Sequence, residues 1–236
     1  RSFGLPPQTS RLKFNGDLRA RYDGIYADDP RIEDRHRARY RVRFGTVAHL
    51  RDNFEVGVRL ASAGSTGGDG GGDPVSTNET LGNTANRKSI GIDQVYAKWS
   101  PLHAADWTGT FTFGKMESPY VFSEMVFDQD YTPEGFAEQF AYAINQRHSA
   151  KLNLGQFILD EIAINSQDPF MLGAQLRLDS AWDTKLQSTF GAAGLGIVNA
   201  RSLVSGNVPN VGRGNTRNAA GELVNEYTSL ILDASL

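Results

Sequence analysis

The chain has 236 residues, of which 39% are hydrophobic, and a formal net charge of −3. No stretch approaches the roughly 18 consecutive apolar residues that a membrane-spanning helix needs, so the composition excludes a helical membrane protein. The small acidic balance argues against a general nucleic-acid-binding protein, because there is no basic excess to neutralise phosphates. The absence of cysteine excludes a disulfide scaffold and a thiolate metal site. A β-barrel stays open, because alternating apolar residues leave its mean hydropathy as low as that of a soluble protein.

Strict alternation of apolar and polar residues begins near the start of the chain, in the segment LKFNGDLRARYDG at 12–24. Side chains of a β-strand point alternately to its two faces, so this pattern predicts a strand with one apolar and one charged face. The same pattern recurs at about 37–50 and at 54–60. Together the three segments predict an antiparallel meander.

Further strands are expected along the rest of the chain, where alternation recurs between turn-forming residues. They cover 93–99, 107–116, 150–159, 170–178 and 184–192, with weaker patterns at 136–144 and from 224 onward. The result is about ten strands of about ten residues, the length that a tilted strand needs to cross an outer membrane. We therefore expect an all-β fold, a transmembrane antiparallel up-and-down β-barrel, in a single domain over residues 1–236.

The connections between these strands alternate between short and long, as in membrane barrels with short periplasmic turns and longer external loops. The short ones are 51–53, 100–106, 145–149 and 179–183, and the long ones are 63–89, 117–135 and 194–221. The glycine-rich stretch 64–73 is expected to be a flexible external loop.

All three tryptophans, Trp99, Trp107 and Trp182, lie beside short turns. Their amphipathic rings suit a membrane–water interface, so the placement indicates an aromatic girdle at the periplasmic side. The alternative is that they cap the core of a soluble protein.

Arginines stand at every second position in RHRARYRVRF, residues 35–44. In a soluble sandwich such a row would be a solvated outer face. Because the alternation recurs in adjacent strands, the apolar faces would form a broad surface that lipid covers most simply, and the arginines would then face an aqueous channel. Like charges two residues apart repel each other unless compensated, and Asp17, Asp23 and Glu55 supply part of that compensation. We name the predicted pore-lining set the arginine face: Arg19, Arg21, Arg37, Arg39, Arg41, Arg43 and Arg59.

The segment ESPYVFSEMVFDQDYTPEGF, residues 117–136, is acidic, aromatic and free of lysine and arginine. Long ordered loops are usually functional, and we hypothesise that this one, at about 117–135, folds into the barrel opposite the arginine face and narrows the pore. The sequence Thr132, Pro133, Glu134 also resembles a helix start. The alternatives are an external acidic loop and a calcium site at Asp128 and Asp130. The acids expected in the constriction are Glu117, Glu124, Asp128, Asp130 and Glu134.

The sequence contains no catalytic constellation. Its four histidines are scattered without metal-ligand spacing, and there is neither a phosphate-binding loop nor a serine elbow. We therefore expect neither an enzyme nor a bound metal or cofactor.

Several segments resemble, in the same order, the family of bacterial outer-membrane proteins called putative porins. They are LKFNGDLRARYDG, IDQVYAKWSP, FTFGKMESPY, FDQDYTPEGFAEQF and LGQFILDE, and the resemblance covers roughly residues 11–178. It implies a diffusion channel in the outer membrane of a Gram-negative bacterium, in contact with lipid and with small hydrophilic solutes or ions, and oligomeric, with a trimer expected. It also implies that the segment after FGK leads into a pore-constricting loop. Family barrels are generally longer and end in an aromatic residue, whereas this chain ends in DASL, so we expect its strands to be part of a larger barrel.

The functional prediction is thus a porin that lets small hydrophilic solutes or ions diffuse passively. One alternative is a plugged barrel that anchors or assembles other proteins. Another is a secreted β-sandwich that binds carbohydrate.

Overall fold

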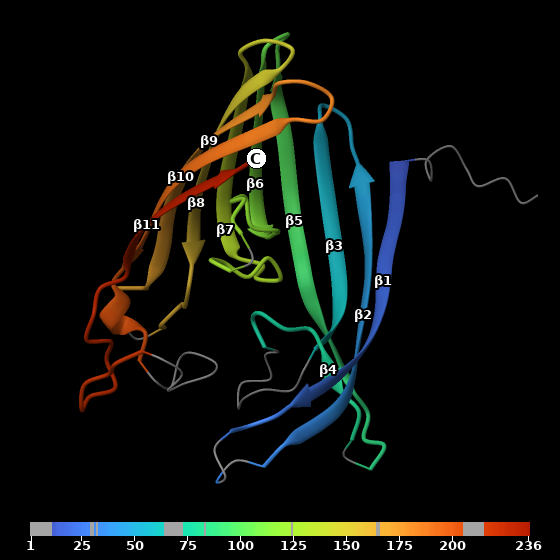
Figure 1. Ribbon diagram of the computed structural model, residues 1–236, viewed down its shortest axis with the longest axis vertical. Helices are drawn as coiled ribbons and strands as arrows, with labels where there is room; N and C mark the ends of the chain where they lie inside the picture. Colours follow the sequence, from blue (N-terminus) through green and yellow to red (C-terminus); the bar gives the residue numbers. More distant parts are fainter. Residues whose placement is uncertain are drawn as a thin grey trace, which may run out of the picture.

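The computed structural model describes residues 11–28, 31, 33–63, 73–82, 84–123, 125–163, 166–204 and 215–236. Consecutive strands pair antiparallel in the order β1-β2-β3-β5-β6-β7-β8-β9-β10-β11, and β4 pairs with β2 beside this path. The sheet is not closed, since β1 and β11 form its two edges (Figure 1). The strands are β1 (Leu12–Ile25), β2 (Arg35–His49), β3 (Phe54–Ala63), β4 (Glu79–Thr80), β5 (Ser89–His103), β6 (Trp107–Lys115), β7 (Glu134–Ala143), β8 (His148–Ile158), β9 (Phe170–Ala181), β10 (Gln187–Val198) and β11 (Thr228–Ser235).

The prediction of an all-β, antiparallel, up-and-down fold is confirmed. Apart from 3-10 conformation at Arg11 and in the short turn η2 (Ala200–Ser202), the described residues form no helix. None of the described segments could therefore cross a membrane as a helix.

The curved sheet has a polar concave face and an apolar convex face, and this is the reverse of a soluble β-sandwich. On the convex face Phe14 and Leu18 are 68% and 76% exposed, whereas Arg41 on the concave face is only 8% exposed. The concave face is covered by the connection between β6 and β7, residues 116–133, which the sheet surrounds (Figure 1). Alternation in the sequence therefore sorts charge inward and apolar side chains outward.

The two ends of the sheet differ in the length of their connections. The four connections at the upper end in Figure 1 are short turns, and the connections at the lower end are long. Two of the turns are closed by side chains: Asn145 Oδ1 accepts the amides of Arg147 and His148, and Asp183 Oδ1 accepts those of Lys185 and Leu186. Such local bonds fix tight turns and hence the register of the strands that they join.

The tryptophans lie at the short-turn end, each beside another aromatic ring. Trp99 stacks on Phe54 with ring centroids 5.6 Å apart, and Trp107 lies 4.6 Å from Tyr142. Trp182 packs edge-on against a neighbouring imidazole, and its indole N–H donates to Ser188. All three remain about half exposed on the sheet.

Three local expectations are wrong. The strand expected at 184–192 is β10 (Gln187–Val198), so 194–198 belongs to a strand and not to a loop, because β9 and β11 supply a full ladder on both sides of this glycine-rich stretch. The turn expected at 100–106 is shorter, since β5 continues to His103. No helix starts at Thr132, because the Pro133 carbonyl accepts the Met116 amide and β7 begins with the next residue.

We expect Gly114→Ala to lower the free energy of unfolding by about 1–3 kcal/mol. The φ of Gly114 is +118°, and a Cβ there would lie 2.3 Å from the Val95 carbonyl oxygen across the β5–β6 ladder. Gly194→Ala is the matched control, because Gly194 has no heavy atom within 4 Å of an added Cβ. Thermal unfolding of both variants in detergent checks this, and equal midpoints would contradict it.

Candidate functional site

The register between β1 and β2 sets arginines directly opposite arginines on the concave face. Arg19 faces Arg41, and Arg21 faces Arg39. Like charges opposite one another destabilise a sheet unless they are compensated, so this part of the arginine face depends on nearby acids.

Two aspartates on β1 supply the first part of this compensation. Asp23 is buried; it contacts Arg21, and its Oδ2 lies 2.9 Å from Arg37 Nε and 3.7 Å from Arg39 Nη1. Asp17 accepts from Arg41 at 3.0 Å and from Arg43 at 2.6 Å. Hydrogen bonds between ionised partners are about twice as strong as neutral ones, so these pairs fix the guanidinium groups in place.

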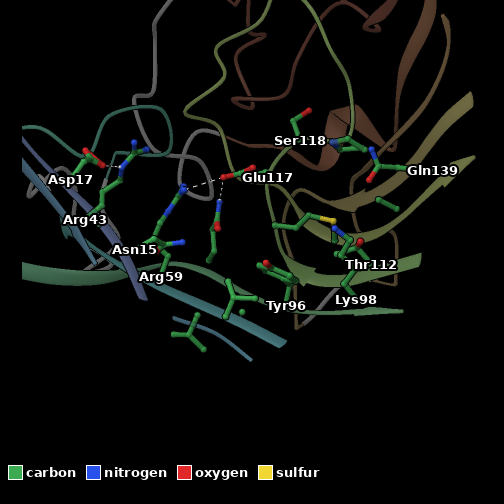
Figure 2. A pocket seen from close by; sticks show the side chains of 18 residues that line it. Asn15, Asp17, Arg43, Arg59, Tyr96, Lys98, Thr112, Glu117, Ser118 and Gln139 are labelled. Atoms are coloured by element: carbon green, nitrogen blue, oxygen red, sulfur yellow. Dashed lines mark hydrogen bonds and ion pairs between the residues drawn. The ribbon is translucent and has the colours of Figure 1, made fainter. Parts of the chain in front are cut away.

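The second part comes from the connection at 116–133, which we call the β6–β7 segment. Its Asp130 lies 3.3 Å from Arg41 and 3.5 Å from Arg43. Its Glu117 lies 3.1 Å from Arg59, a contact that Figure 2 shows beside the pair of Asp17 and Arg43. The β6–β7 segment therefore brings Glu117 and Asp130 to arginines that lie 58 and 89 residues earlier in the sequence.

A β-bulge in β5 adds an acid that sequence analysis missed. The pairing of β3 with β5 shifts between Arg59 and Leu60, so Asp93 and Gln94 both turn to the concave side and are buried. Asp93 contacts Arg59, and Gln94 Nε2 donates to Glu117 at 3.2 Å. In a regular strand, consecutive side chains point to opposite faces of the sheet. A bulge is needed to put Asp93 and Gln94 on the same face.

The β6–β7 segment is anchored to the opposite side of the concave face, on β8 and β9. Gln175 on β9 is fully buried; its Oε1 accepts the Val121 amide at 3.0 Å, and its Nε2 donates to the Val121 carbonyl at 2.8 Å. The amide side chain thus binds Val121 as a neighbouring strand would. Arg177 donates to the same carbonyl at 3.1 Å.

Aromatic packing reinforces this anchor. Tyr120 and Phe122 join a buried cluster with Phe157 and Met171 from β8 and β9. The Tyr120 hydroxyl lies directly over Gly173, where an added Cβ would be 2.2 Å away, so the ring occupies space that only glycine leaves free. The segment therefore has an apolar first half seated on β8–β9 and acids that reach β2 and β3.

Both tyrosines of the segment stay neutral. Burial raises the pKa of Tyr120, and burial together with the carboxylate of Glu134 raises the pKa of Tyr131. Neither phenol therefore adds negative charge beside the arginine face at physiological pH.

The remaining predicted acids lie elsewhere. Asp128 accepts the Asp130 amide at 2.8 Å and so shapes the segment locally. Glu134 pairs with Lys115 at 3.0 Å, at the start of β7. Glu55 binds His49 and Tyr96, and it pairs with no arginine of the described ranges. Glu124 lies outside the described residues.

A second segment crosses the arginine face, and sequence analysis expected it to be an external loop. The described residues 73–82, which we call the β4 segment, fold back so that β4 pairs with β2 at Arg39 and Tyr40. Within it, Asn78 Oδ1 accepts from Arg19 at 2.8 Å and the Asn78 carbonyl accepts from Arg39 at 2.9 Å. The preceding glycine-rich residues 64–72 lie outside the described part.

Between the arginine face and the β6–β7 segment lies a cavity of about 560 Å³ (Figure 2). Its lining is charged and polar, and includes Arg43, Arg59, Lys98, Glu117 and Gln139. Such a lining suits hydrated solutes better than apolar ligands. In the part of the chain that the structure describes, no three His, Asp or Glu side chains are grouped as metal ligands.

Comparison with known proteins gives one family. The sequence model of a family described as "Putative porin" matches residues 27–208. No curated protein that was compared matches the chain.

We expect Gln175→Leu to release the β6–β7 segment, because it removes both hydrogen bonds of the buried Gln175 amide to the Val121 backbone at a cost of about 1–3 kcal/mol. A spin label on Met125→Cys, a side chain that is 96% exposed, reports the release as faster motion. The chain has no native cysteine, so the label is unique. Gln187→Leu at the exposed start of β10 is the control, and identical spectra in both variants would contradict the anchoring role.

Proposed function

Because the chain belongs to the family of putative porins, we propose that it forms a passive pathway for small hydrophilic solutes or ions across a bacterial outer membrane. The observation that carries the proposal is the sorting of side chains by the sheet, with charge on the concave face and large apolar side chains exposed on the convex face. Diffusion through such a pathway needs no catalytic group and no cofactor.

Lipid is the proposed cover of the convex face. Exposed apolar side chains run along neighbouring strands from β1 to β11. Contact of this apolar area with water would be unfavourable by a large hydrophobic free energy. They include Phe14, Leu18, Phe44, Ile90, Ile92, Phe113, Leu176, Phe190, Leu230 and Leu232. The half-exposed Trp99, Trp107 and Trp182 would then meet the membrane–water interface at the short-turn end.

The β6–β7 segment is the proposed constriction. Asp130 and Glu117 reach the arginine face from this segment and pair with it directly, and the paired Arg59 and Glu117 line a polar cavity. Opposed charge of this kind orients and selects solutes in a narrow channel. The arginines would line the passage, and the segment would set its width.

A homotrimer is the proposed assembly, as the family resemblance implies. The second candidate function is a plugged barrel that holds other proteins. It is favoured by the seating of Tyr120 and Phe122 in a buried cluster, because this packing fills part of the concave side. Conductance separates the two functions.

We expect discrete conductance steps from the intact protein in a planar bilayer. In the double variant Glu117→Gln/Asp130→Asn, the permeability ratio of anions to cations should rise about twofold or more, because Arg41, Arg43 and Arg59 lose acids that compensate them. The measurement is the reversal potential under a salt gradient.

The charge-matched control is Asp52→Asn/Asp106→Asn, which removes two acids from exposed short turns. Its reversal potential should stay close to that of the unaltered protein. A folded protein without any conductance would refute the open channel and support the plugged barrel.

A further inference from the structure

The charges of β1 and β2 do not balance on the concave face. Of the six arginines that β1 and β2 contribute to the arginine face, five share three carboxylates, those of Asp17, Asp23 and Asp130. Among the described residues, Arg19 is the member of this group without a carboxylate within ion-pair distance. The positive excess therefore concentrates around Arg19 and the arginines next to it on β2.

Three guanidinium groups at this place keep a buried donor unused. The Nε–H groups of Arg19, Arg39 and Arg41 are buried and donate to no acceptor among the described residues. Arg41 as a whole is only 8% exposed. Buried polar groups in proteins nearly always have a partner, so three such donors on neighbouring residues need an acceptor that the described part of the chain does not supply.

The β4 segment gathers these arginines. Asn78 is 7% exposed and accepts from both Arg19 and Arg39, which come from different strands. Leu81 donates its amide to the Ala38 carbonyl, and Ser62 Oγ donates to the Thr77 carbonyl, so the segment is fixed on both sides of Asn78. The cluster is thus held by contacts that leave the Nε–H groups free.

We propose that Arg19, Arg39 and Arg41 form a binding site for a tetrahedral oxyanion, a phosphate or sulfate group, under the β4 segment. This rests on the proposed function and deepens it, because it names the solute class that the pathway would carry. A site with several buried N–H donors that lack a partner and an excess of positive charge matches a multivalent oxyanion with several acceptor oxygens. Chloride offers no directed acceptors, and a carboxylate offers fewer oxygens and a single charge.

The test is calorimetric titration of the detergent-solubilised intact protein in a chloride buffer with inorganic phosphate, inorganic sulfate and acetate. Phosphate or sulfate should bind saturably, and acetate should not. Arg19→Gln should weaken this binding about tenfold or more, because it removes a charge-assisted donor without leaving an acid unpaired. Lys151→Gln removes the same charge near Asp179 on the other side of the face and should have little effect.

Asn78→Asp provides a second variant. Its carboxylate would sit 2.8 Å from Arg19, where the asparagine oxygen now lies, and would repel the anion. Loss of binding in this variant and in Arg19→Gln supports the site. Binding of acetate as tight as that of phosphate, no saturable binding of any of the three, or equal weakening by Lys151→Gln would overturn it.

Conductance distinguishes this site from the channel itself. If the protein binds phosphate but passes no current, the proposed channel function is refuted and the anion site is supported. If the protein conducts but shows no saturable oxyanion binding, the channel function is supported and the anion site is refuted.

Discussion

The constraint on which the rest of the structure depends is repulsion among the inward-facing arginines of β1 and β2. The register that turns them to the concave face puts Arg19 opposite Arg41 and Arg21 opposite Arg39, and neither pair is stable alone. Asp17 and Asp23 relieve part of the repulsion within the strands. A further part is relieved by groups from connections, the carboxylate of Asp130 in the β6–β7 segment and the carbonyl and amide oxygens of Asn78 in the β4 segment. Folding of the two connections onto the sheet and compensation of the arginine face are therefore one event.

The opposite side of the concave face is built differently. Around β8 and β9 the inward positions under Tyr120 and Val121 are glycines, apolar residues and the neutral amides of Asn153 and Gln175, and the charged Lys151, Arg177 and Asp179 follow nearer the short-turn end. The small Gly173 leaves room for Tyr120, and Gln175 binds the backbone of Val121. The sheet thus offers a neutral, shape-selective seat on one side and a charged surface on the other, and a single segment spans both.

Alternation in the sequence predicts most of the strands because it reports directly on which face each residue occupies. The bounds of β1 and β3 follow from it to within a few residues, and the sorting of charge from apolar side chains follows as well. It fails where local composition misleads: the glycines of β10 resemble a loop, and only the neighbouring β9 and β11 keep them extended. It also fails where contacts are distant in sequence. Gln175 meets Val121 across 54 residues, Asn78 meets Arg19 across 59, and the bulge at Asp93 depends on pairing with β3. The one local signal for Gln175 was a polar side chain at an inward position between Gly173 and Arg177.

The two attachments of the β6–β7 segment respond differently to the salt content of the medium. Its acidic contacts with Arg41, Arg43 and Arg59 are partly exposed charge pairs, which mobile ions screen over a Debye length of about 8 Å at 0.15 M and about 3 Å at 1 M. Its seat on Gln175 and the aromatic cluster contains no charge pair and is not screened in this way. Rising ionic strength would therefore loosen the contacts of Glu117 and Asp130 and leave the seat at Tyr120, Val121 and Phe122 between them as a pivot. The width of the cavity beside the arginine face would follow the ionic strength around the protein without any dedicated sensor.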